Sequence, residues 1–221
     1  MPDLTRPTTV YLVDDQNILR AAFRSLLSQD PRFDVVGDSA DARQAIEHIA
    51  ELRPDVVLLD ITMPGLSGLD AIEPIRKAWP KVRILMLTHH EGETFVEQAL
   101  ASGADGYLSK DSEPEELTIA IQAVHRAQPY VSPKVAGGLV SRTRRKEGEP
   151  ETLSRIGSLT PREREVFQLL ALGKSNKEVA RDLGMSLGTA KKHRENLQRK
   201  LDCQSTAELA RLAIREGLMG A

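Results

Sequence analysis

Carboxylate, hydroxyl and ammonium side chains stand at or just past the ends of four short apolar runs in this sequence. They are Asp14, Asp15, Asp60, Thr88 and Lys110. Clustered carboxylates repel one another unless a cation joins them, and their hard oxygen atoms suit Mg²⁺. Bound metal and Lys110 could hold a phosphoryl group, with Thr88 donating to a phosphate oxygen and Asp60 as the nucleophile. These residue types therefore indicate phosphoryl transfer to a carboxylate.

The five side chains can meet only if a sheet brings the ends of the apolar runs to one edge. Strands are predicted at 9–14, 34–37, 55–60, 83–88 and 106–109. Several of these runs are apolar throughout, which is typical of parallel strands buried on both faces. Amphipathic stretches such as IEHIAEL and FVEQALASG alternate with them. Five βα repeats predict a doubly wound α/β fold, flavodoxin-like, with five parallel strands in the order 2-1-3-4-5 and ligands at the carboxyl ends of the strands.

Four motifs carry a resemblance to a known family. They are VDD (13–15), LDITMPG (59–65), LT (87–88) and GYLSK (106–110). Together they resemble the receiver domain of bacterial two-component response regulators, over about residues 8–127. The resemblance implies that Asp60 accepts a phosphoryl group from a phosphohistidine on a sensor kinase. It also implies that Asp15, Asp60 and the backbone carbonyl of Thr62 bind Mg²⁺, with Asp14 supporting the metal through water.

The same resemblance assigns a switch to the remaining site residues. Lys110 would pair with Asp60 or with its phosphate, and the hydroxyl of Thr88 would couple to the ring of Tyr107. Phosphate would draw the hydroxyl inward and the ring would follow, so activation would shift a population between two states. The alternative for Tyr107 is plain packing at the edge of the sheet.

His89 and His90 depart from the family pattern, because many receivers have a small residue directly after the hydroxyl. Our hypothesis is that these histidines, with Thr62, flank the route of water to the acyl phosphate and tune its lifetime. The alternative is a pair of loop histidines without a kinetic role, and adjacent spacing without a nearby Cys is poor for zinc. Unchanged dephosphorylation rates in His89→Ala and His90→Ala would reject the hypothesis.

The rear of the chain differs from the front in charge and in expected structure. Residues 1–132 hold 12 Lys and Arg against 21 Asp and Glu, whereas residues 158–221 hold 12 against 8. Ser or Thr followed three residues later by Glu matches a capping box. This pattern occurs at Thr160, Ser175 and Ser205, and a fourth helix start is expected at Ser186. Four short helices and a basic balance indicate a second module with a different partner.

The residues from about Asn176 to Glu195 predict a helix-turn-helix, whose second helix can enter the major groove of DNA. LTPREREV (159–166), LGKSNKEVA (172–180) and TAKKH (189–193) are similar to LuxR-type DNA-binding domains, over about residues 155–219. That similarity implies one set of side chains facing base edges and another nearer the DNA backbone. The first set is Lys191, Lys192 and Glu195, and the second is Thr189, His193, Arg194, Asn196 and Arg199. The alternative is a solvated helix face in an unrelated bundle.

Bulk properties are those of an ordinary globular protein, with 221 residues of which 40% are hydrophobic and 28% charged. The start of the chain lacks the basic and apolar segments of a secretory signal, and no apolar run approaches the ~20 residues that cross a bilayer. A single cysteine, Cys203, fits a reducing compartment and is expected to pack in a core. We expect a cytoplasmic protein that has no membrane partner.

Together the two resemblances indicate a NarL/FixJ-class response regulator, with a receiver at 8–127, a linker at 128–154 and a small all-α, four-helix helix-turn-helix domain at 155–219. The expected partners are a sensor histidine kinase, double-stranded DNA and a second copy of the chain, with RNA polymerase as a further candidate. Phosphorylation would release the tail, favour a homodimer and regulate transcription. No enzyme activity is expected beyond the receiver's own phosphoryl transfer and dephosphorylation.

Two other functions share parts of this pattern. An aspartyl-phosphate hydrolase of the haloacid dehalogenase type requires a second acid two residues beyond the nucleophile, where this chain has Thr62. A receiver that signals only by protein contact, with a tail that no longer binds DNA, would leave no nuclease-protection footprint on genomic DNA.

Overall fold

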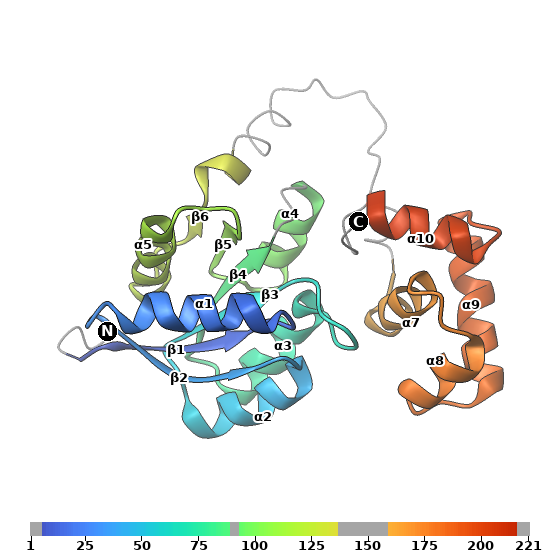
Figure 1. Ribbon diagram of the computed structural model, residues 1–221, viewed down its shortest axis with the longest axis horizontal. Helices are drawn as coiled ribbons and strands as arrows, with labels where there is room; N and C mark the ends of the chain where they lie inside the picture. The colour runs from blue at the N-terminus through green and yellow to red at the C-terminus, as the bar shows by residue number, and fades with distance from the viewer. Residues whose placement is uncertain (1–5, 89–92, 137–158, 216–221) are drawn as a thin grey trace. The chain divides into compact units, whose positions relative to one another are not determined.

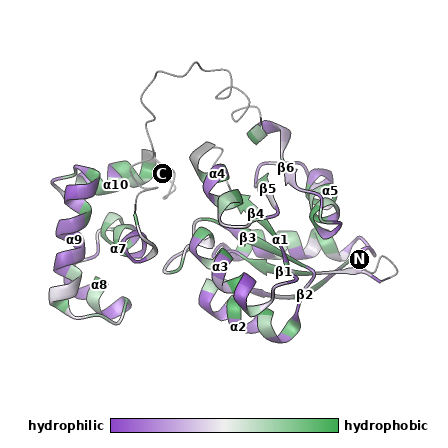
Figure 2. Ribbon diagram, turned by 180° about the vertical axis from the view of Figure 1, so that it is seen from behind, coloured by the Kyte–Doolittle hydropathy of each residue, from purple (hydrophilic) through white to green (hydrophobic). Residues whose placement is uncertain are grey.

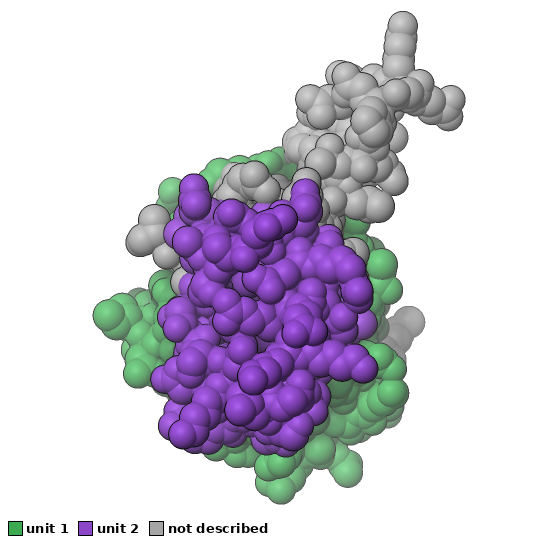
Figure 3. Space-filling view, turned by 90° about the vertical axis from the view of Figure 1, so that its right-hand side faces the viewer, with its two compact units in different colours: residues 1–148 green, residues 149–221 purple. Residues whose placement is uncertain are grey.

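The computed structural model describes residues 6–88, 93–136 and 159–215, and the chain divides into two compact units, residues 1–148 and 149–221 (Figure 3). The first unit contains a parallel sheet in the order β2-β1-β3-β4-β5-β6. Its strands are β1 (Thr8–Val13), β2 (Phe33–Ser39), β3 (Val56–Asp60), β4 (Arg83–Thr88), β5 (Gly106–Ser109) and β6 (Tyr130–Val131). The five predicted strands and their order are confirmed.

The sixth strand was not predicted. β6 has two residues and lies within the stretch that the sequence assigned to a linker, and it pairs parallel to β5. Its backbone is held by Tyr130 N–H donating to Asp105 O at 3.3 Å and Ser132 N–H donating to Tyr107 O at 3.0 Å. So short a strand offers no alternation of apolar and polar residues, so periodicity could not reveal it.

Helices cover both faces of the sheet (Figure 1). They are α1 (Asn17–Ser28), α2 (Ala42–Leu52), α3 (Gly68–Ala78), α4 (Glu93–Ala101) and α5 (Pro114–His125). Alternate strand residues such as Val10, Leu58 and Leu87 pack in one core with the helices α1 and α5. Because successive strand residues point to opposite faces, the neighbouring buried residues face the other helices. Burial on both faces explains why the central strands are apolar without alternation.

The second unit consists, in its described part, of α7 (Pro161–Ala171), α8 (Asn176–Asp182), α9 (Leu187–Leu201) and α10 (Thr206–Arg215). The capping boxes predicted at Thr160 and Ser175 are confirmed, and Ser186 caps α9 by accepting from Thr189 N–H at 3.1 Å. At Ser205 only half of the predicted box forms. Its hydroxyl accepts from Glu208 N–H, but the Glu208 carboxylate accepts from Gln204 N–H instead.

Buried apolar side chains from these helices form the core of the second unit, and they include Phe167, Leu197 and Leu209. Cys203 is buried in that core, as expected. Figure 2 shows hydrophilic residues over much of α9. Within the described part of the chain, no helix combines the length and apolar character that a membrane span requires.

Candidate functional site

The carboxyl ends of four neighbouring strands bring the predicted site residues to one edge of the sheet. Asp60 and Thr88 are the last residues of β3 and β4, while Asp14 and Lys110 directly follow β1 and β5. β3 lies between β1 and β4, so Asp60 has a site residue on either side. Lys110 N–H donates to Thr88 O at 2.8 Å, which continues the pairing of β4 and β5 to the edge.

Lys110 joins two of the carboxylates. Its Nζ lies 2.7 Å from Asp14 Oδ2 and 2.9 Å from Asp60 Oδ2, and its side chain is only 1% exposed. The other oxygen of Asp14 accepts from Gln16 N–H at 2.8 Å. Because water is largely excluded, each of these ion pairs is stronger than a surface pair. The ammonium is therefore held at the position where a phosphoryl group on Asp60 would carry its negative charge.

Asp14, Asp15 and Asp60 form an acidic cluster. Each offers one carboxylate oxygen, and these oxygens all lie within 4.8 Å of one another. Asp15 is partly exposed, whereas Asp14 and Asp60 are buried. Three hard oxygen donors with open access on one side fit Mg²⁺, which keeps several waters and takes few carboxylates from the protein.

Burial and neighbouring charges shift the pKa values of Asp60 and Asp15. Burial raises the pKa of Asp60 from 3.8 to about 6, against the pull of Lys110, and Asp14 raises it further. A hydrogen bond from Thr62 N–H opposes this rise. Burial and then the charge of Asp14 raise the pKa of Asp15. Crowded carboxylates of this kind are stabilised by a cation.

The two residues of the predicted switch are both buried. Thr88 and Tyr107 are each 0% exposed, so the ring of Tyr107 lies inside the fold and not at its surface. Met63, in the turn after Asp60, is also buried, and Gly65 has a φ of +79° that favours glycine. His89 and His90, predicted to tune the phosphate lifetime, lie outside the described residues.

In the second unit the predicted helix-turn-helix is formed by α8 and α9, with Gly184 in the turn at a φ of +60°. Ala190, Leu197 and Leu201 are the buried residues of α9. The predicted DNA-facing side chains divide into two groups by exposure. Lys191, Lys192, Glu195, Thr189 and Arg199 are exposed, and His193, Arg194 and Asn196 are partly buried.

Three cations of α9 have partners inside the unit. Arg194 donates to Thr206 Oγ1 at 2.9 Å, which joins α9 to the start of α10. Arg199 donates to Asn196 Oδ1 at 2.8 Å, and Lys200 pairs with Glu163 Oε2 at 2.7 Å at the start of α7. Both Lys191 and Lys192 are exposed: Lys192 lies on the face opposite the buried Leu197 and Leu201, and Lys191 lies on the flank between the two faces.

Comparisons with known proteins find a family match in each of the two units. The family described as response regulator receiver domain matches residues 10–122, and the family of bacterial regulatory proteins, luxR family, matches residues 157–213. The transcriptional regulatory protein MctR of Rhizobium johnstonii is 35% identical over 95% of this chain and 94% of its own. The nitrate/nitrite response regulator protein NarL of Escherichia coli K12 is 35% identical, over 92% of this chain and 94% of its own.

The chain belongs to the NarL/FixJ class of two-component response regulators. It joins a receiver to a LuxR-type DNA-binding domain, which is the composition of a transcription regulator. Solved structures of the same class are also similar. A LuxR-family response regulator from Aurantimonas is 36% identical with a TM-score of 0.60, over 62% of this chain and 98% of its own. The response regulator ChrA is 28% identical with a TM-score of 0.53, over 97% of this chain and all of its own.

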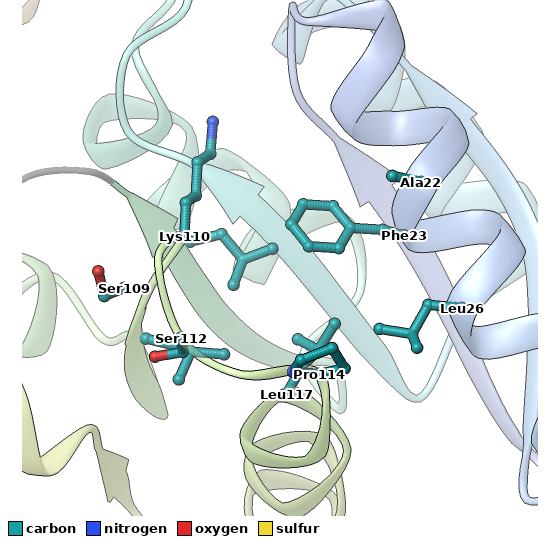
Figure 4. Close-up of a pocket in the computed structure, with 10 residues that line it drawn as sticks. Ala22, Phe23, Leu26, Ser109, Lys110, Ser112, Pro114 and Leu117 are labelled. Carbon is teal, nitrogen blue, oxygen red and sulfur yellow. The ribbon is translucent and has the colours of Figure 1, made fainter.

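An apolar cleft of about 270 Å³ borders the receiver site of this response regulator (Figure 4). Phe23 and Leu26 of α1 line one side, Pro114 and Leu117 of α5 line the other, and the stem of Lys110 closes one end. In Figure 4 the ammonium of Lys110 points away from Pro114 and Leu117. The stem of Lys110 lines this cleft, while its side chain is only 1% exposed.

Sequence reasoning missed one residue that shapes the site from behind. A Cβ added to Gly68, the first residue of α3, would lie 1.8 Å from the carbonyl oxygen of Asp60. Its N–H donates to Ile61 O at 3.0 Å. Only glycine therefore allows α3 to start against the backbone of the proposed nucleophile. The LSG end of the turn was the available signal, but a glycine in a turn does not reveal which backbone it approaches.

The raised pKa of Asp60 gives a pH-dependent prediction for Asp60→Asn. The folded state holds the proton up to a pH of about 6, while the ordinary value is 3.8. Ionisation of Asp60 therefore lowers the free energy of unfolding. The loss reaches its full size above pH 6 and disappears as the pH falls below 3.8. Asp60→Asn should unfold with a free energy about 2–3 kcal/mol higher than the wild type at pH 8, without divalent cations.

The fluorescence of Trp79, the chain's single tryptophan, measures this unfolding in the receiver, because its indole N–H donates to Pro54 O. The gain from Asp60→Asn should shrink towards zero at pH 4. Asp34→Asn, on the exposed side of β2, is the matched control and should give no such gain. Equal stability of Asp60→Asn and the wild type at pH 8 would contradict the predicted burial penalty.

Proposed function

We propose that Asp60 is the phosphoacceptor of this response regulator and that its phosphorylation by a sensor histidine kinase controls DNA binding by α9. The observation that carries the proposal is the buried ion pair of Lys110 with Asp14 and Asp60, at a sheet edge that also presents Asp15 and Thr88. A lysine this deeply buried cannot act as a surface charge, whereas its ammonium would form a charge-assisted hydrogen bond with a phosphoryl group on Asp60.

Phosphoryl transfer would use the carboxylate of Asp60 as the nucleophile. One of its oxygens attacks the phosphorus of a phosphohistidine, a P–O bond forms, and the P–N bond to the kinase imidazole breaks. Lys110 pairs with the oxygens of the transferred group, and the hydroxyl of Thr88 donates to one of them. Asp15, Asp60 and the carbonyl of Thr62 would hold Mg²⁺, with Asp14 acting through water. Mg²⁺ supplies positive charge that neutralises the oxygens of the phosphoryl group.

The switch would respond to the added charge. A phosphoryl group brings about −1.5 to −2 charge and strong acceptors, and Thr88 would be drawn towards them. Thr88 and Tyr107 are both buried on the paired strands β4 and β5, where close packing would couple a movement of the hydroxyl to the ring. Thr62, His89 and His90 would set the access of water to the acyl phosphate and therefore the lifetime of the active state.

The output would be DNA recognition by the second unit. Lys191, Lys192 and Glu195 are exposed together on α9 and would face base edges. Thr189, His193, Arg194, Asn196 and Arg199 would lie near the DNA backbone, although Arg194 also holds α10. We propose domains at 8–127 and 155–219 with a linker at 128–154, whose first residues pair with the receiver sheet as β6. We also propose an active homodimer in the cytoplasm that reads paired half-sites, with RNA polymerase as a further partner.

The direct test of the proposed function is phosphorylation of the full chain by acetyl phosphate with Mg²⁺. Mass spectrometry should find one added phosphoryl group, and peptide mapping should place it on Asp60. Asp60→Asn should take up none, while Asp34→Asn, with the same charge change at an exposed site, should match the wild type. A wild-type chain that stays unmodified, or one modified on another residue, would refute the assignment.

DNA binding gives a second prediction. Lys191→Ala should weaken binding to a target site and reduce the slope of log K against log salt by about 1, because each cation that enters the groove displaces about one counterion from the DNA. Lys77→Ala removes the same charge from an exposed receiver position and should leave the slope unchanged.

Glu195→Ala should change which bases are preferred. Equal tightening by Glu195→Ala on all sequences would mean that Glu195 only repels DNA.

A further inference from the structure

Arg20 forms hydrogen bonds to three residues around the acidic cluster, and no sequence pattern predicted them. It lies on α1, its side chain is 14% exposed, and three of its nitrogens have separate acceptors. Nη1 donates to the carbonyl oxygen of Asp14 at 2.5 Å, Nη2 to Asn17 Oδ1 at 2.7 Å and Nε to Asp38 Oδ2 at 3.0 Å. One guanidinium therefore connects the end of β1, the start of α1 and strand β2.

We propose that Arg20 is a positioning residue, which holds the loop from Asp14 to Asn17 in the geometry that the carboxylate of Asp15 needs to bind Mg²⁺. The inference rests on the proposed function, because it concerns the same metal site.

The contact with Asp14 is made to the backbone, and this matters for Asp15. The carbonyl of Asp14 belongs to the peptide plane that ends at the Asp15 nitrogen, so fixing that oxygen fixes the plane. The Asp15 carboxylate accepts a hydrogen bond from its own backbone N–H, and Lys110 and Arg20 act on it through their charges. Its position is therefore set by its backbone. Asp14, by contrast, has Lys110 and Gln16 N–H on its own carboxylate.

Asp38 anchors the guanidinium from the other side. It accepts from Arg20 and also from Arg24, one turn further along α1. Burial alone would raise the pKa of Asp38, but hydrogen bonds from both guanidiniums hold it below its usual range, so the anchor stays charged. Arg24 binds the same carboxylate as Arg20. Among the described residues, its hydrogen bond goes to Asp38 and not to the loop from Asp14 to Asn17. It is the matched control that the chain itself offers.

A lysine could not replace Arg20 in this role. The planar fork of arginine presents several donors in fixed directions, whereas an ammonium is a point charge on a flexible stem. Charge and geometry can therefore be separated by substitution. Removing a cation near a Mg²⁺ site should by itself strengthen Mg²⁺ binding, because like charges repel. Loss of a positioning contact should weaken it, so the two explanations predict changes of opposite sign.

The test measures the dissociation constant of Mg²⁺ by titration calorimetry on the full chain at constant ionic strength. The variants are Arg20→Gln, Arg20→Lys and Arg24→Gln, and Trp79 fluorescence confirms that each receiver is folded. We expect Arg20→Gln and Arg20→Lys to bind Mg²⁺ about tenfold more weakly, in line with other residues that orient metal ligands. Arg24→Gln should stay within about twofold of the wild type.

Phosphorylation by acetyl phosphate provides the second readout. The Mg²⁺ concentration for half-maximal rate should rise for both Arg20 variants, while the rate at saturating Mg²⁺ stays close to the wild-type rate. Unchanged or tighter Mg²⁺ binding in Arg20→Gln would overturn the proposal, as would full Mg²⁺ affinity in Arg20→Lys or an equal loss in Arg24→Gln. If Arg20→Gln does not fold, Arg20→Lys alone decides between these outcomes.

The two readouts also separate this proposal from the proposed function. A wild-type chain that binds Mg²⁺ but takes no phosphoryl group on Asp60 would refute the function, and the Mg²⁺ affinities would still test Arg20. A phosphorylated wild type with Arg20 variants of normal Mg²⁺ affinity would refute the role of Arg20 and leave the function intact.

Discussion

The ammonium of Lys110, buried between the carboxylates of Asp14 and Asp60, is the interaction on which the rest of the receiver site depends. Buried carboxylates at close range cannot all ionise without a cation. Lys110 compensates one of the three charges that Asp14, Asp15 and Asp60 carry when ionised, so two formal negative charges remain. A divalent cation would neutralise that remainder. The same ammonium then lies where an acyl phosphate on Asp60 would require a positive partner.

The fold achieves this arrangement through the carboxyl edge of a parallel sheet, where residues distant in sequence meet. Contacts with the backbone position the site further, because α3 starts against the carbonyl of Asp60 and Arg20 donates to the carbonyl of Asp14. In the second unit, side-chain contacts position the helix α9. Arg194 and Lys200 bind α10 and α7, and these contacts fix the helix whose exposed face carries Lys191 and Lys192. In both units, contacts within the fold orient the side chains that are proposed to meet a partner.

Much of this could be predicted from the sequence, because the signals were local or repeated. Strands buried on both faces give unbroken apolar runs, and capping boxes at Thr160 and Ser175 mark helix starts. What escaped prediction depends on distances across the fold. Neither the approach of Gly68 to Asp60 nor the grip of Arg20 on Asp14 leaves a pattern along the chain. β6 is too short to show an alternation of apolar and polar residues, and only its pairing with β5 identifies it as a strand.

The central claim is that Lys110 and the three carboxylates form one electrostatic unit that also takes Mg²⁺. The most direct measurement is the Mg²⁺ dissociation constant of Lys110→Met compared with that of the wild type at pH 8, above the pKa of about 6 of Asp60. Removal of a buried cation next to the site should tighten Mg²⁺ binding about tenfold. Mg²⁺ affinity that is unchanged or weaker in Lys110→Met would show that the lysine and the metal do not share these carboxylates.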